Sequence, residues 1–356
     1  MYFEQVQMMP RVHPENRPPC SRLYNSDIKG LLFDVSYFEK RINLEVFHAL
    51  ADGAGALHFL QQLVWDYLVL RYGYDRNLAD GLPYDASHSQ KEEDSFSRYY
   101  RPGIRSVEKT RRIPAYQERY PYLSESRIQV LTGHVCVSEG LELCKKLGVT
   151  LTAYLAAVLL LSYSKTMTWK DRKRPVVLAI PVNLRRFYDS ETSRNFFSLI
   201  YVRYTFEEDD TDFLCILTSV KEQFQKQITA ENVFHRVQKL VAIERNPFIR
   251  GIPLILKNPG LRIANSFVQK ESTTTLSNLG TISMPDFCKT HISGFHAYIG
   301  TERTQLTICS YQDGLSLCFS TSFAGLEVQK HFFRKLADDG LSVSISASER
   351  PETEEK

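Results

Sequence analysis

One short motif combines the side-chain types best suited to chemistry in this chain of 356 residues: His48, Asp52 and Gly53. A neutral imidazole, with a pKa of about 6.5, can take a proton from a hydroxyl and return it to a leaving group. We therefore predict that His48 is a general base. Asp52 follows a tight corner, and we expect it to be a structural acid that pairs with a buried arginine. Gly53 would let the backbone approach a bound substrate closely.

A strand and a helix are expected to position this motif. Between residues 40 and 50 apolar side chains alternate with polar ones, which predicts a strand that ends near His48. Between residues 54 and 72 apolar side chains recur three or four positions apart, which predicts an amphipathic helix. The histidine is therefore expected at a strand-to-helix corner.

The other segments mix strands and helices without strict alternation. Residues 1–30 are rich in proline and predict an extended arm, and residues 73–124 predict a long irregular excursion. Further strands are predicted at residues 30–38, 128–137, 176–180, 196–206, 273–276, 297–300, 305–311 and 315–322. Further helices are predicted at residues 141–147 with Ser138 as N-cap, 151–163, 210–228 and 326–336. This pattern predicts a mixed α/β (α+β) fold with large mixed sheets.

Composition narrows the function classes. The net charge of +3 is spread along the chain, with short basic stretches at 101–112 and 170–174, so we predict no nucleic-acid partner. The apolar stretch 151–163 is shorter than the roughly 20 residues of a spanning helix, which predicts a buried core helix and no transmembrane segment. Residues 248–261 mix apolar and basic side chains. A helix packed on a sheet is favoured there, and a peripheral membrane contact is the alternative.

The seven cysteines are odd in number and include no C-x-x-C pair, which predicts free thiols and neither a disulfide framework nor a metal site. No basic and apolar leader is visible at the start of the chain, so the predicted location is cytoplasmic. No cysteine has surroundings that suggest a nucleophile. Direct transfer in a ternary complex is therefore favoured over a covalent intermediate.

The spacing of His48, Asp52 and Gly53 resembles the active-site signature of the acyl-CoA-dependent acyltransferase superfamily. That superfamily includes chloramphenicol acetyltransferase, plant acyltransferases, wax ester synthases, alcohol acetyltransferases and peptide-synthetase condensation domains. A second segment, residues 181–186 followed by 194–197, is similar to the block after the mid-chain strand of these enzymes. A third, residues 274–280, looks like the Ser-Asn-x-x-Gly strand end of wax ester synthases and alcohol acetyltransferases.

The resemblance implies specific roles for further residues. Arg185 is expected to pair with Asp52, and Ser277 and Asn278 are candidate donors to the oxyanion or to the pantetheine of the donor. The implied fold has two chloramphenicol acetyltransferase-like subdomains, residues 1–170 and 171–348, with a channel between them and a charged tail at 349–356.

The implied activity is that of an O-acyltransferase nearest the alcohol acetyltransferases. Acyl-CoA would be the co-substrate, with acetyl as the expected group, a small-molecule alcohol would be the acceptor, and no cofactor would stay bound. One alternative is condensation-type ester or amide formation from a thioester on a carrier protein. Another is a catalytically inactive relative that binds a ligand.

The chain also departs from the family pattern. Phe47 stands where many relatives have a second histidine, which matches the single-histidine branches, and the plant-type Asp-Phe-Gly-Trp-Gly motif is absent. The 47 residues ahead of His48 are fewer than the family usually has. These features predict an N-terminally shortened chain outside the plant branch.

Overall fold

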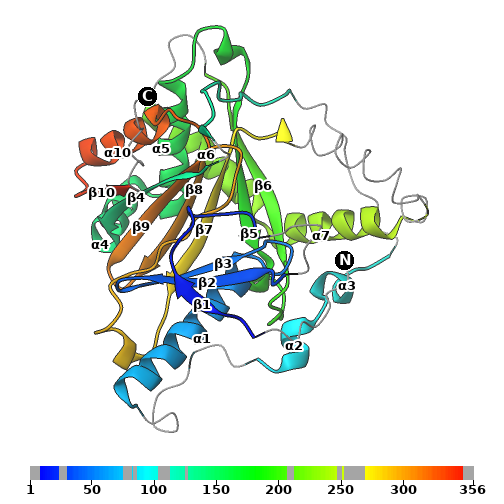
Figure 1. Cartoon of the computed structure of the whole chain (residues 1–356). Helices are drawn as coiled ribbons and strands as arrows, with labels where there is room; N and C mark the ends of the chain where they lie inside the picture. The colour runs from blue at the N-terminus through cyan, green and yellow to red at the C-terminus, as the bar shows by residue number, and fades with distance from the viewer. Residues whose placement is uncertain are drawn as a thin grey trace.

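Two β-sheets organise the chain in the computed structural model, which describes residues 9–23, 30–74, 82, 86–102, 113–124, 127–206, 212–246, 251 and 269–347 (Figure 1). The larger sheet has seven strands, in the order β10 (Ser344–Ala347), β4 (Gln129–Cys136), β9 (Gly314–Thr321), β8 (Gln305–Tyr311), β7 (Thr274–Ile282), β5 (Val176–Asn183) and β6 (Phe197–Tyr204). The smaller sheet has three, in the order β1 (Val12–Pro14), β2 (Phe33–Phe38) and β3 (Arg41–Val46).

Both sheets contain parallel and antiparallel pairs. In the larger sheet β7 runs parallel to β5 and β8, and the other neighbours are antiparallel. In the smaller sheet β1 is parallel to β2, and β2 and β3 form an antiparallel hairpin. The predicted mixed α/β fold with mixed sheets is confirmed.

Helices cover one face of the larger sheet: α4 (Val137–Leu147), α5 (Leu151–Ser164), α6 (Phe213–Gln227) and α10 (Glu327–Asp338). The main core lies there, because α5 is buried from Ala153 onward and packs with apolar residues of β5, β6, β7 and β9. Among the described residues no single helix has the length and apolar content to cross a membrane. Helices α4 and α5 have the length and apolar content of a membrane span only when counted as a pair, and that pair is bent by 84°.

The helix after the motif, α1 (Gly53–Tyr72), is anchored to the far end of β7. Leu60, Val64 and Leu68 pack in a second apolar cluster with Ile282, and Gln61 donates a hydrogen bond of 2.7 Å to the carbonyl of Ser283. The smaller sheet lies in front of the larger one in Figure 1, with α1 below it. These contacts set the corner between β3 and α1.

Several predicted elements differ from the structure. Residues 297–300 form no strand, and the amide of Ile299 donates to the side-chain Oγ of Ser320 at 3.1 Å instead of to a strand carbonyl. The helix expected at 141–147 begins at Val137. The predicted N-cap Ser138 instead hydrogen-bonds to Asp313.

The predicted excursion at 73–124 contains two short helices, α2 (His88–Glu92) and α3 (Ser95–Arg98). A longer helix, α7 (Ala230–Arg245), was not predicted. The tail 349–356 and the segment 248–261, apart from Gly251, lie outside the described residues.

The predicted boundary at residue 170 falls after α5. Strand β4, which precedes that boundary, shares the larger sheet with strands that follow it. The division into residues 1–170 and 171–348 stays a prediction.

Candidate active site

His48 lies in a turn two residues after β3 ends, so the expected strand-to-helix corner is present, although the strand stops at Val46. The residue is exposed. Its ring centroid lies 5.9 Å from that of Phe197 at the start of β6, and its carbonyl oxygen accepts a hydrogen bond of 2.9 Å from the side-chain amide of Asn195. The histidine is thus held at its backbone, and none of the described residues forms a hydrogen bond with its ring.

Asp52 is buried, with 5% of its surface exposed, and caps the start of α1. Its Oδ1 accepts the amide of Gly55 at 2.9 Å, which satisfies one of the free N–H groups at a helix N-terminus. Its Oδ2 accepts the amide of Phe196, also at 2.9 Å. Nη1 and Nη2 of Arg185 donate to the two carboxylate oxygens at 2.8 and 3.2 Å. The carboxylate therefore faces four donors.

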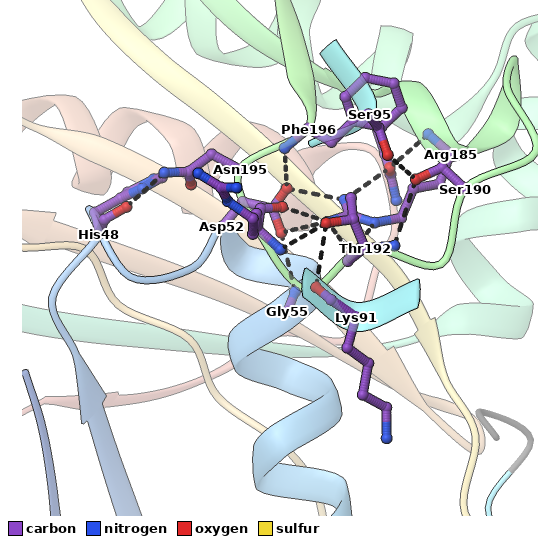
Figure 2. A network of polar contacts seen from close by, with 12 residues as sticks. His48, Asp52, Gly55, Lys91, Ser95, Arg185, Ser190, Thr192, Asn195 and Phe196 are labelled. Atoms are coloured by element: carbon purple, nitrogen blue, oxygen red, sulfur yellow. Dashed lines mark hydrogen bonds and ion pairs between the residues drawn. The ribbon is translucent and has the colours of Figure 1, made fainter. Parts of the chain in front are cut away.

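Arg185 comes from the short 3₁₀ turn that follows β5. Beyond Asp52, its guanidinium donates to the carbonyls of Thr192 and Arg194 at 2.7 to 2.9 Å, and to Oδ1 of Asn183 at 3.2 Å. Planar, bidentate pairing of this kind is the geometry that guanidinium and carboxylate groups favour. The structure thus brings together Asp52 and Arg185, 133 residues apart (Figure 2).

The loop of residues 190–194, whose carbonyls accept hydrogen bonds from Arg185, is itself held by α2 and α3. The Oγ1 of Thr192 donates to the carbonyl of Glu93 at 2.7 Å, the amide of Ser193 donates to the carbonyl of Lys91 at 2.8 Å, and the hydroxyls of Ser95 and Ser190 are 2.7 Å apart. Thr192, Ser95 and Ser190 are buried. Part of the segment 73–124, which the sequence predicted to be irregular, therefore supplies hydrogen-bond partners to the network in Figure 2.

Two glycines make the corner possible. A Cβ on Gly55 would lie 2.2 Å from the carbonyl oxygen of Ser193, a main-chain atom that cannot easily move. A Cβ on Gly53 would lie 2.8 Å from the Cδ2 of Leu279, the end of a flexible side chain. Space at Gly53 is therefore limited by a neighbouring side chain, whereas α1 packs directly on the 190–194 loop at Gly55.

A cavity of about 2240 Å³ opens beside His48. It lies between the smaller sheet and the larger sheet, and its wall includes Asn43 of β3, Leu57 of α1, Ser277 of β7 and Thr307 of β8. A cavity of this size exceeds the usual range of about 300–1,000 Å³ for small-ligand sites.

The two candidate oxyanion donors differ in their contacts. Asn278 uses both ends of its carboxamide: Nδ2 donates to Oγ1 of Thr152 at 2.8 Å, and Oδ1 accepts the amide of Gly280 at 2.8 Å. That second bond accompanies a bulge in β7, where Gly280 has a φ of +80°. Both Ser277 and Asn278 lie on the cavity wall.

His58 lies on α1 near the buried ion pair. Burial lowers the pKa of its imidazole to about 4, and the positive charge of Arg185 acts in the same direction. It is therefore neutral near pH 7. The described residues include no group of three or more His, Cys, Asp or Glu side chains that could hold a metal ion.

Asn195 and Thr192 are contributors that sequence reasoning did not assign. Asn195 lay within the segment 194–197 used for the family resemblance, so a signal was present, but its contact with the His48 carbonyl could not be inferred from it. Thr192 carries no such signal, because it serves Arg185 through its main-chain carbonyl.

Comparison with known proteins bears on the fold. No protein-family model matches the chain, and no curated protein matches it significantly in sequence. Polyketide synthase associated protein 5 from Mycobacterium tuberculosis is similar in structure, with a TM-score of 0.51 and 13% identity, over 89% of this chain and 78% of that one.

Two other solved structures are similar at lower scores. The epimerization domain from the third module of tyrocidine synthetase B is 12% identical, with a TM-score of 0.49 over 87% of this chain and 72% of that one. Trichothecene 15-O-acetyltransferase from Fusarium sporotrichioides is 13% identical, with a TM-score of 0.49 over 84% of this chain and 65% of that one. At 13% identity, the likeness to polyketide synthase associated protein 5 shows that the two chains share a fold.

Proposed function

We propose that this chain is a cytoplasmic acyltransferase that moves an acyl group from acyl-CoA to the hydroxyl of a small-molecule alcohol. The observation that carries the proposal is the placing of His48. Its ring lies exposed at the wall of a large cavity, while Asp52, four residues later, is buried with Arg185. An accessible imidazole can exchange protons with a substrate, and a carboxylate already filled by four donors cannot.

In the proposed reaction the neutral imidazole of His48 accepts the proton of the acceptor hydroxyl as its oxygen attacks the thioester carbonyl. Negative charge develops on the carbonyl oxygen in the tetrahedral intermediate. The intermediate collapses as its C–S bond breaks, and the imidazolium returns the proton to the departing thiolate. The products are an ester and the free thiol of CoA, so no proton or electron is left over.

Ser277 is the side chain that we assign to the developing oxyanion. Ser277 and Asn278 both line the cavity beside His48, but the carboxamide nitrogen of Asn278 already donates to Thr152. A hydroxyl donor at that position would stabilise the transition state more than the ground state. Asn278 would then shape the bulge of β7 rather than touch the oxyanion.

The test is release of free thiol from a panel of acyl-CoAs, from acetyl upward, combined with a panel of alcohols. His48→Gln removes the base while keeping a polar side chain, and we expect kcat to fall by about 10²- to 10⁴-fold with the melting temperature unchanged. The matched control is His235→Gln, which alters a histidine on α7 outside the cavity. It should behave as the unmodified protein does.

Three results would contradict the proposal. Thiol release that is equal in the His48→Gln variant and the unmodified protein would exclude His48 as the base. Transfer from acyl-pantetheine on a carrier protein, with none from any acyl-CoA, would favour the condensation-type reaction instead. No transfer from either donor would favour a relative that only binds a ligand.

A further inference from the structure

We propose that Asn195 is a positioning residue that fixes the His48 imidazole by holding the carbonyl oxygen of His48. This inference rests on the proposed role of His48 as the base. Asn195 would not touch substrate. It would act through the main chain of the catalytic residue, from the segment just before β6.

The contact is a single hydrogen bond that joins the end of β3 in the smaller sheet to the start of β6 in the larger sheet. Nδ2 of Asn195, just before β6, donates to the His48 carbonyl at 2.9 Å (Figure 2). On the β3 side, the amide of Phe47 donates to the carbonyl of Leu32 and the amide of Leu50 donates to the carbonyl of Phe47, each at 2.8 Å. The peptide that follows His48 therefore takes its anchor from Asn195 rather than from its own hairpin.

The neighbours of Asn195 show that this short segment is shaped around the motif. The amide of Phe196 donates to Oδ2 of Asp52, and the ring of Phe197 lies beside the ring of His48. Three successive residues thus contact the carbonyl of His48, the carboxylate of Asp52 and the imidazole. A shift at Asn195 would reach His48 directly.

Stability alone gives little reason for an asparagine at this position. Oδ1 of Asn195 is buried and has no hydrogen-bond partner among the described residues. A buried acceptor without a partner costs free energy, so a half-satisfied carboxamide stabilises a fold poorly. The hydrogen bond to the His48 carbonyl is the remaining reason for an asparagine at position 195.

The expected consequence is kinetic. The plane of the peptide after His48 helps to set the direction in which its side chain leaves the backbone. A displacement of about 1 Å between a base and its substrate can cost about a hundredfold in rate. Loss of the Asn195 bond should therefore lower kcat by about tenfold to a hundredfold, while KM stays within about twofold.

The test compares Asn195→Ala with a matched control, Asn232→Ala. Asn232 also donates from Nδ2 to a main-chain carbonyl, that of Lys226 at 2.7 Å, but near the start of α7. A second variant, Asn195→Gln, keeps the amide donor on a longer side chain and should recover part of kcat. Melting temperature is measured for all three.

A second measurement reports on His48 without activity. In protein labelled with carbon-13 at histidine, the His48 ring resonance is assigned by its loss in His48→Gln. Its ring-current shift arises from the neighbouring Phe197 ring. In Asn195→Ala this resonance should move toward the position of a free histidine, and in Asn232→Ala it should stay in place.

Unchanged kcat together with an unmoved His48 resonance in Asn195→Ala would overturn the proposal. So would a fall in kcat that tracks a fall in melting temperature and leaves the resonance in place, because that pattern marks a merely structural residue. If the unmodified protein transfers no acyl group, the proposed function fails. The resonance still decides whether Asn195 positions His48.

Discussion

Breaking the buried pair of Asp52 and Arg185 from one side should cost far more stability than breaking an exposed ion pair. We expect Arg185→Ala to lower the free energy of unfolding by about 3–5 kcal/mol, because it leaves a buried carboxylate without its counter-charge. Asp52→Ala should cost a similar amount, since it leaves the guanidinium buried in the same way. Asp52→Asn, which keeps the size of the side chain, is the milder variant should either of these fail to fold.

The magnitude follows from the contacts. The side chains of Asp52 and Arg185 are 6% and 10% exposed, so water cannot replace the lost partner. In Arg185→Ala the carboxylate keeps two amide donors, from Gly55 and Phe196, and loses both guanidinium donors. The carbonyl of Thr192 also loses the two hydrogen bonds that it accepted from the guanidinium.

The assay is urea unfolding followed by the fluorescence of Trp65 and Trp169, the chain's two tryptophans. The control is Glu142→Gln, which removes an exposed i,i+4 partner of Lys146 and should leave the unfolding midpoint in place.

The double variant Asp52→Ala with Arg185→Ala completes a thermodynamic cycle. It should cost clearly less than the sum of the two single variants, because the second substitution removes the charge that the first left unpaired. Additivity of the two losses to within about 0.5 kcal/mol would refute the argument, since independent sites behave in that way.

Two further predictions concern the same corner. Burial lowers the pKa of His58 to about 4, below the value near 6.5 of an unfolded imidazole, so its contribution to stability is present above pH 6.5 and lost as the pH falls toward 4. Urea unfolding should show a loss of at most about 1 kcal/mol per pH unit across that window, and His58→Gln should flatten the profile; parallel profiles would contradict the assignment. Gly55→Ala places a Cβ 2.2 Å from the carbonyl oxygen of Ser193 and should cost about 2 kcal/mol or more in the same assay. Gly30→Ala, which meets nothing within 4 Å, is its control, and equal midpoints for the two variants would show that the backbone gives way.

Sequence patterns were most informative for long elements whose own apolar periodicity marks them. The apolar period after the motif placed α1 within one residue of its actual start at Gly53, and the capping bond from Asp52 explains why it starts there. Helix α7 was missed, although Val233, Val237 and Val241 recur four apart and are buried. A search for helical periodicity over 230–245 would have found it.

Short elements and main-chain contacts were beyond the reach of such patterns. Helices α2 and α3 have five and four residues, too few to show a helical period. The pairing of Asp52 with Arg185 was expected from family resemblance, but half of the donors to that carboxylate are backbone amides. Any residue type except proline supplies an amide, so no sequence signal marks those contacts.

The buried pair also explains how the motif can leave its histidine free. A buried ion pair adds little net stability over an apolar replacement, yet it is costly to break from one side, so it favours one arrangement over alternatives. Here that arrangement joins the corner after β3 to the turn after β5 and the start of β6. Because Asp52, Asn195 and the 190–194 loop fix the backbone around His48, the imidazole needs no buried partner of its own. Its edge can stay open to the cavity, where a base has to meet its substrate.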